Sequence, residues 1–288
     1  MAMLTTSRRI FVLGVLLAGC TRAGVGTSFD ASTSDDAGID AEVDAGSDQG
    51  FFGASRCSGA GLRFCEDFED ASVLDGSTWK SAIHNGSLTI DSIHAARGGS
   101  ALHVHVLNAM GNHASLTNTS LFTSAGWPGN HYFGRTFLWL EPAATAMHNG
   151  FITSQGPLLL PGGADTGQTA VYGVHETFGN FVTHYSNSNA PGAGGCDCGA
   201  KSTQPIPVGH WACIEWEFDG PASTSRLWLD GTEVPSGAIT PALDWVAPRF
   251  ESLAFGFTMY HTSSDATVAY DLWYDALALD SARIGCER

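Results

Sequence analysis

The stretch from residue 131 to 140, HYFGRTFLWL, places a histidine and an arginine among large aromatic residues. Its composition predicts a β-strand, in which side chains alternate between the two faces. One face then carries His131, Phe133, Arg135, Phe137 and Trp139. Aromatic rings offer flat surfaces to sugar rings, and a planar guanidinium group suits a carboxylate. This face is therefore our first candidate for binding an acidic glycan.

Other residues that could bind a sugar or transfer a proton lie on neighbouring candidate strands. His103 and His105 share one face of SALHVHV, and His148 stands at the start of the strand after the opening stretch. Imidazole and phenol groups can act as bases and acids near neutral pH. The remaining candidates are Tyr172, Glu176, His184 and Tyr260.

A carboxylate pair offers a different chemistry. In CIEWEFD, Glu215, Glu217 and Asp219 alternate along one predicted strand and share a face. Glycoside hydrolysis needs two carboxyl groups a few ångströms apart. The order departs from the Glu-x-Asp-x-x-Glu form of jelly-roll glucanases, so hydrolysis is the weaker alternative.

The elements that position these residues follow an export signal. Residues 1–19 contain Arg8 and Arg9, an apolar run too short to span a membrane, and LAG before Cys20. This pattern resembles a bacterial lipobox, which implies cleavage before Cys20 and lipidation of its thiol. The alternative is an ordinary secretory signal. Thr21 stands where an aspartate would signal retention, so we expect the outer membrane or the cell surface.

Residues 20–50 are predicted to be a lipidated tether. The segment after Cys20 has seven acidic residues, one basic residue and few apolar side chains. It cannot bury enough apolar area to offset its chain entropy, and its charges keep it extended. We expect the membrane to be reached through the lipid anchor only.

Residues 51–288 are long enough for one domain, which we expect to be a monomer. This part has 22 acidic and 10 basic residues. Nucleic-acid binding needs basic surface, so nucleic acid is excluded as a partner. The partner that the candidate face predicts is a polysaccharide.

The domain contains six cysteines, an even number that predicts three disulfides in an exported chain. Fifteen pairings are possible from the sequence. Zinc is the alternative, because Cys196-Asp197-Cys198 and 11 histidines could supply ligands. No C-x-x-C pair is present, which disfavours that alternative.

Short alternating runs separated by Gly, Pro, Asn and Asp predict an all-β sandwich of two antiparallel sheets. No run has the length and period of an amphipathic helix. The predicted strands are 61–69, 87–94, 100–108, 131–140, 148–155, 170–177, 180–186, 211–219, 225–234, 252–260 and 268–280.

Two resemblances sharpen this prediction. Residues 210–234 resemble the strand pair of laminin-G, pentraxin and concanavalin-like jelly rolls, with Asp219-Gly220 and Asp230-Gly231 as turns. Residues 62–286 contain, in order, FCEDFED, RGGSALHV, GRTFLWL, MHNGFI, WACIEW and LWYDALALDSARIGC. Together these motifs resemble the core domain of the fungal cellulose-induced secreted protein family, which is related to glucuronan and alginate lyases.

That resemblance implies a concanavalin A-like jelly roll with a concave sugar-binding cleft. It also implies a polysaccharide lyase, in which donors neutralise a uronate carboxylate while a base removes the neighbouring proton. Arg135 would be the neutraliser and His148 the base or a second neutraliser. Tyr172 or Tyr260 would protonate the leaving oxygen. A glycan-binding module without catalysis and an adhesive surface protein are the alternatives. Both glycan hypotheses require Arg135, His148, Trp139 and Tyr260 to converge in one groove.

The family pattern further implies a structural Ca²⁺ ion and one disulfide. The calcium ligands would be Glu69, the carbonyl of Arg97, the side chain of Ser100 and Asp275. The disulfide would join Cys213 to Cys286. Cys57 with Cys65 and Cys196 with Cys198 would then remain, a pairing that the sequence leaves open.

Overall fold

The computed structural model describes residues 50–288 except 60, 123–126, 160–161, 188–196, 244 and 265–267. The predicted signal peptide, Cys20 and nearly all of the tether lie outside the described residues and stay predictions. Among the residues described, no helix has the length and apolar character needed to cross a membrane.

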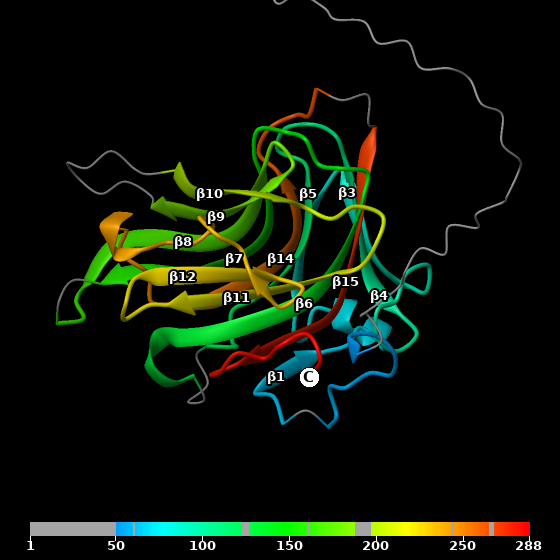
Figure 1. The fold of residues 1–288 in the computed structure, drawn as a ribbon, viewed down its shortest axis with the longest axis horizontal. Coiled ribbons are helices and arrows are strands. Elements are labelled where there is room, and N and C mark those ends of the chain that lie inside the picture. The colour runs from blue at the N-terminus through cyan, green and yellow to red at the C-terminus, as the bar shows by residue number, and fades with distance from the viewer. Residues whose placement is uncertain are drawn as a thin grey trace, which may run out of the picture. The chain divides into compact units, whose positions relative to one another are not determined.

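Two antiparallel sheets stack face to face and form the predicted jelly roll (Figure 1). The eight-stranded sheet has the order β13-β12-β11-β6-β15-β4-β3, and β1 pairs with residues 277–279 of β15. Its strands are β1 (Phe64–Glu66), β3 (Gly86–Asp91), β4 (Ala101–Leu107), β6 (His131–Glu141), β11 (Ala212–Asp219), β12 (Thr224–Leu229), β13 (Thr232–Glu233) and β15 (Ala269–Asp280).

The seven-stranded sheet has the order β10-β9-β8-β7-β14-β5-β2. Its strands bend along their length, and the face turned away from the other sheet is the concave one (Figure 1). They are β2 (Lys80–His84), β5 (His113–Asn118), β7 (Asn149–Leu159), β8 (Asp165–Thr177), β9 (Asn180–Asn187), β10 (Asp197–Pro205) and β14 (Ser252–Met259). Short 3-10 helices join some of the strands: η2 (Ala71–Leu74), η3 (Pro128–Asn130) and η4 (Pro241–Leu243).

Alternate side chains of each strand fill the space between the sheets. On β6 the residues Tyr132, Leu138 and Leu140 are buried in this core, as the alternation predicts. Gly134 lies between them under the ring of Trp216, where an added Cβ would come within 2.0 Å of a ring carbon. Only glycine leaves room for the indole of Trp216 there. This explains why a glycine stands among the large residues on the core face of β6.

The chain changes sheets between β6 and β7. These strands are neighbours in sequence, but β6 belongs to the eight-stranded sheet and β7 to the seven-stranded one. Residues 142–148 make the connection. Motifs that are adjacent in the sequence therefore face opposite sides of the molecule.

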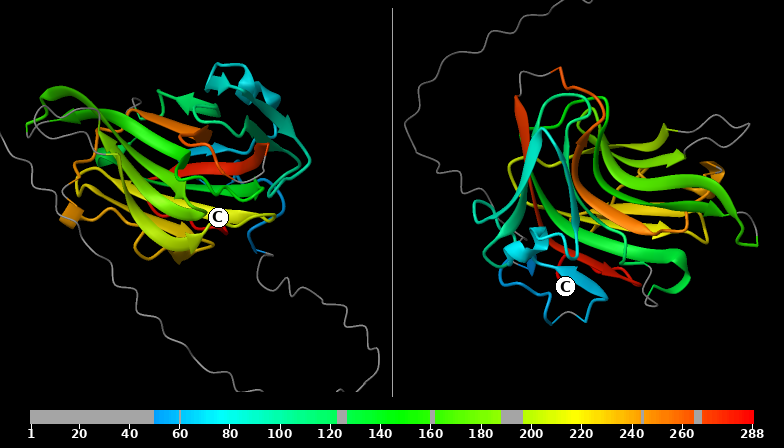
Figure 2. Two further views of the ribbon diagram at one scale, coloured as in Figure 1. Left: turned by 90° about the horizontal axis from the view of Figure 1, so that it is seen from above. Right: turned by 180° about the vertical axis from the view of Figure 1, so that it is seen from behind.

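The outer face of the eight-stranded sheet is covered by both ends of the described domain. Phe52 packs on Phe137 with ring centroids 5.7 Å apart, and Cys286 joins the same buried cluster. Figure 2 shows the first described segment, in blue, beside the C-terminus. This cover excludes solvent from the middle of the face.

Two of the three expected disulfides are present. Cys213 bonds to Cys286, which confirms the expected pair, and Cys57 bonds to Cys65, a pairing that the sequence left open. The third expected pair includes Cys196, which lies outside the described residues.

Candidate functional site

Two adjoining hollows lie on the concave face of the seven-stranded sheet. The first, of about 250 Å³, is lined among others by His148, His184, Lys201 and His261. The second, of about 120 Å³, lies over β7 and β14 and is lined among others by Tyr260. The rings of His148 and Tyr260 stack between the two hollows at a centroid distance of 4.8 Å.

Strand register brings these side chains together from separate parts of the sequence. Met259, the last residue of β14, pairs with Asn149, the first residue of β7. Tyr260 and His148 each stand one residue beyond that pair, which places them side by side. The hydroxyl-bearing ring of Tyr260 remains 41% exposed, so it can meet a ligand on the concave face.

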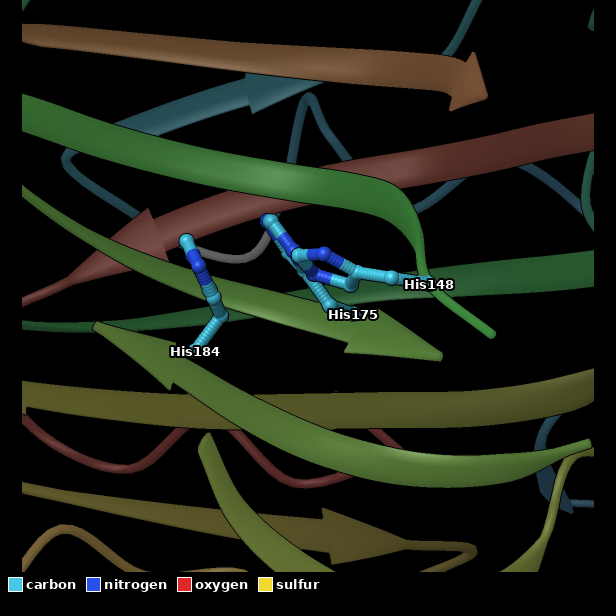
Figure 3. A group of neighbouring side chains, drawn as sticks. All are labelled: His148, His175 and His184. Carbon is cyan, nitrogen blue, oxygen red and sulfur yellow. The ribbon is translucent and has the colours of Figure 1, made fainter. Parts of the chain in front are cut away.

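His148 also belongs to a compact cluster with His175 and His184 (Figure 3). His175 lies on β8 and His184 on β9, and their rings stack at 4.2 Å. The Nε2 atom of His148 lies 2.7 Å from Nδ1 of His175, which is a hydrogen bond. His175 is fully buried, and His184 is nearly so.

Burial determines the charge of the central histidine. It lowers the pKa of His175 well below the ordinary value, and the neighbouring His184 and His148 lower it further. The imidazole of His175 is therefore neutral at physiological pH. A neutral ring has one donor and one acceptor nitrogen, so it can hold His148 in one orientation.

The predicted convergence of four residues is wrong. Arg135 and Trp139 lie on the outer face of the eight-stranded sheet, whereas His148 and Tyr260 lie on the concave face of the other sheet. Arg135 is 1% exposed and donates from Nη1 to the main-chain oxygen of Arg288 at 2.8 Å. A guanidinium that is covered in this way cannot bind a glycan, so Arg135 has a structural role.

The other residues predicted to share a sugar-binding face with Arg135 also lie on the outer side of the eight-stranded sheet. The prediction that they line the concave cleft is therefore wrong. Phe137 is buried beneath Phe52. The ring of His94 stacks on Trp139 at 4.0 Å and occupies one of its faces. The remaining members, His103, His105, His131 and Phe133, alternate along β4 and β6 on this outer side.

Neighbouring carboxylates contact three of the histidines on this outer face. His103 contacts Asp91 and Asp271, each at 2.8 Å, and His105 contacts Asp271 at the same distance. His131 contacts Glu217 at 2.8 Å. These hydrogen-bond networks lie on the surface of the eight-stranded sheet, apart from the two concave hollows.

Tyr172 and Glu176 are also corrected. Tyr172 is fully buried in the core between the sheets, so it cannot protonate a leaving group. Glu176 is fully buried and accepts hydrogen bonds from Nδ2 of Asn149 at 2.8 Å and from the amide of Gly179 at 2.7 Å. Burial raises the pKa of Glu176 to about 7 despite these bonds. Glu176 therefore closes a turn and, because it is fully buried, offers no surface to a ligand.

The hydrolase alternative loses one of its three carboxylates. Glu215 is 1% exposed and accepts from Arg283 and from the amide of Gly285, both at 2.7 Å. Only Glu217 and Asp219 remain partly accessible on that face, and His131 already contacts Glu217.

Sequence reasoning found His148, His184 and Tyr260 but missed His175, Lys201 and His261. A signal for His175 was present. In AVYGVHET the apolar residues Tyr172 and Val174 alternate, which puts them in the core and His175 on the opposite face. Lys201 had no such signal, because β10 has no clear apolar alternation.

The predicted calcium ligands come together at a second place. Glu69 accepts from the amides of Gly99 and Ser100 through Oε1 at 2.8 and 3.1 Å. Asp275 accepts from the amides of Ala96 and Arg97 through Oδ2, each at 2.8 Å. Its Oδ1 is buried and has no hydrogen-bond partner among the described residues.

The electrostatics of this second place fit a bound cation. Burial raises the pKa of Asp275 to about 7, the amide hydrogen bonds oppose this rise, and the charge of Glu69 adds to it. Two carboxylates beside loop oxygens are the ligands that Ca²⁺ prefers. The residues present therefore fit calcium, which stays a prediction.

The sheet order and the covered and open faces define a β-sandwich protein of the jelly-roll class. More narrowly, the family model described as polysaccharide lyase-like, Cip1-like core domain, matches residues 67–282. The chain belongs to this family, and its function concerns polysaccharides.

Two solved structures are similar to the chain. The cellulose-induced protein Cip1 has a TM-score of 0.55 and 20% identity over 77% of this chain and 99% of that one. An endo-β-1,4-glucuronan lyase from the fungus Trichoderma reesei has a TM-score of 0.56 and 14% identity over 77% of this chain and 96% of that one. At such identities the likeness shows the shared jelly-roll fold. No curated protein matches the sequence.

Proposed function

We propose that the concave face of the seven-stranded sheet binds a uronate-containing polysaccharide and cleaves it by β-elimination. The observation that carries this proposal is the exposed ring of Tyr260 stacked on His148 between two hollows. Membership of a polysaccharide lyase-like family and the likeness to a glucuronan lyase support it.

The reaction assigns a role to each group on this face. The phenolate of Tyr260 takes the proton beside the carboxylate, the electron pair forms the carbon–carbon double bond, and the glycosidic C–O bond breaks. The phenol then returns the proton to the leaving oxygen. Lys201, which lines the same hollow as His148, and His148 itself face the carboxylate and offset its developing charge.

The test is a screen of polyuronates for absorbance of the unsaturated product, followed by Tyr260→Phe on any substrate found. This substitution keeps the aromatic stack and removes the hydroxyl. Positioned acid–base groups contribute about 10²- to 10⁴-fold, so we expect turnover to fall by at least about 100-fold with little change in KM.

Tyr185→Phe is the matched control, because that hydroxyl donates to the carbonyl of Val246 on the core side of β9. Its turnover should match that of the unaltered protein. Wild-type turnover in Tyr260→Phe would place the chemistry elsewhere.

A glycan-binding module without turnover is the second candidate. No described arginine lines either concave hollow, so Lys201 is the sole Lys or Arg among their lining residues. Binding of a polyuronate that is weakened by Lys201→Met, with no unsaturated product from any substrate, would favour this candidate.

We further propose that the protein is exported and anchored through lipid on Cys20. The apolar run and the small residues before Cys20 support this proposal. Cys20→Ala should block processing or release the protein from the membrane fraction. A variant that still sediments with membranes would contradict lipid anchoring.

A further inference from the structure

The turn between β8 and β9 carries a large aromatic residue where small residues are usual. Thr177 pairs with Asn180, so the turn consists of Phe178 and Gly179. Their φ angles are 50° and 81°. Two-residue hairpin turns with positive φ at both positions favour Asn-Gly, Asp-Gly or Gly-Gly. A phenylalanine in this conformation is strained, because its Cβ comes too close to the following carbonyl oxygen.

Packing does not explain why a phenylalanine stands at this position. Phe178 is 63% exposed, so its ring adds little to the core. Asparagine or glycine would form the same turn at a lower conformational cost. Backbone strain that folding does not require is concentrated at sites that bind ligands. The strained position therefore indicates a function for the exposed ring.

Hydrogen bonds from two sides hold this turn in place. The amide of Phe178 donates to the carbonyl of Ala146 at 2.8 Å. The buried carboxylate of Glu176 accepts from the amide of Gly179 at 2.7 Å and from Nδ2 of Asn149 at 2.8 Å. The turn is thus fastened to β7 and to the segment that leads into it, so the backbone that carries the ring is fixed.

The exposed ring belongs to the candidate site but stands away from the tyrosine. Phe178 lines the same hollow as His148 and Lys201. It directly follows β8, whereas Tyr260 directly follows β14, and β7 lies between these two strands. Two strand spacings amount to roughly 10 Å, which is more than the width of one sugar ring. A sugar unit over Phe178 is then a neighbour of the unit that meets Tyr260.

We propose that Phe178 is a binding platform for a sugar unit next to the reacting uronate. The apolar face of that sugar would lie on the phenyl ring, and Met147, 49% exposed in the same hollow, extends the apolar surface. This inference rests on the proposed function. It adds that the concave face recognises a chain of sugar units and not a single one.

The test compares the full-length protein with its Phe178→Asn and Phe178→Trp variants. Asparagine keeps the turn and removes the ring, whereas tryptophan keeps a flat aromatic surface. Isothermal titration calorimetry measures the affinity for polyglucuronate and for polymannuronate. Covering one face of an exposed phenylalanine is worth about tenfold in affinity. We expect Phe178→Asn to bind about tenfold more weakly and Phe178→Trp to bind at least as well as the unaltered protein.

The melting temperature separates a binding role from a structural one. Asparagine adopts positive φ more readily than phenylalanine, so Phe178→Asn should raise Tm by about 2–4 °C while it weakens binding. Ile93→Asn is the control, because Ile93 is 66% exposed and follows β3 of the other sheet. It should leave the affinity for both polymers unchanged.

Equal affinity of Phe178→Asn and the unaltered protein for both polymers would overturn the platform. A fall in both Tm and affinity would show a structural role and overturn it as well. These measurements need no turnover, so this inference and the lyase can fail separately. Binding that depends on Phe178 without any unsaturated product would support the platform and count against the lyase. Cleavage with an unchanged KM in Phe178→Asn would support the lyase and overturn the platform. A protein that binds neither polymer would overturn both.

Discussion

Arg135 shows how one residue can have the right chemistry for a site and a different role. Its guanidinium lies beneath the C-terminal segment, bonds to the main-chain oxygen of Arg288 and lies 5.4 Å from the ring of Phe137. Burial, and next the like charge of Arg97, lower the pKa of Arg135 to about 9. That pKa stays above neutral pH, so the group remains charged and fastens the segment.

Arg135→Met should therefore lower stability and leave glycan binding and any turnover unchanged. It removes a hydrogen bond from a charged donor, for which about 1.5–3 kcal/mol is typical. Part of that loss is offset because a buried charge is removed as well. We expect the free energy of unfolding in urea to fall by about 1–3 kcal/mol.

Lys201→Met is the matched comparison, because it removes an exposed cation from the concave face. It should weaken glycan binding and leave the urea midpoint nearly unchanged. Loss of turnover in Arg135→Met at unchanged stability would return Arg135 to the active site.

At the scale of elements, the phase of one strand decided which residues of AVYGVHET reach the concave face. Tyr172 and Val174 enter the core, and His175 faces outward. If the alternation along a strand is assigned one residue out of phase, every side chain is placed on the wrong face, because successive side chains point to opposite faces. The sequence held the correct answer here, since two apolar residues alternate with Gly173 and His175.

Other elements carried weaker signals. Strands β2, β5 and β10 were not predicted, because KSAIH, HASLTN and DCGAKSTQP contain few apolar residues. Their partners in the sheet impose the extended conformation. The change of sheet between β6 and β7 was likewise hidden, because a seven-residue connection can join strands of one sheet or of two.

At the scale of the whole molecule, the two ends of the domain are fastened together. Strand β1 pairs with the last part of β15, and the Cys213–Cys286 disulfide holds the C-terminal segment on the eight-stranded sheet. Glu69 follows β1 closely, and Asp275 lies on β15. A calcium ion between them would add a third connection.

Removal of calcium should therefore lower the melting temperature. A ligand that binds only the native state stabilises it by about 2.7 kcal/mol at a hundredfold excess over its Kd. EGTA should lower Tm, added Ca²⁺ should restore it, and Asp275→Asn should melt at the same temperature with or without EGTA. Differential scanning calorimetry measures all three effects.

Asp271→Asn is the control, because this carboxylate lies on the same strand and contacts His103 and His105. It should keep the response to EGTA. An unaltered protein whose Tm does not respond to EGTA or Ca²⁺ would show that Glu69 and Asp275 hold no structural calcium.

The sequence by itself determined an all-β sandwich and most of its strands, because alternation and turn residues are local signals. The jelly-roll class and the Cys213–Cys286 pair came from the ordered motifs that resemble a known family. It also supplied His148, His184 and Tyr260 as candidates. Only the tertiary structure decided that these residues gather with His175 while Arg135 lies under the chain's end. The reason is physical: strand pairing and the covering of one outer face by the terminal segments depend on contacts between residues far apart in sequence, and no local pattern encodes them.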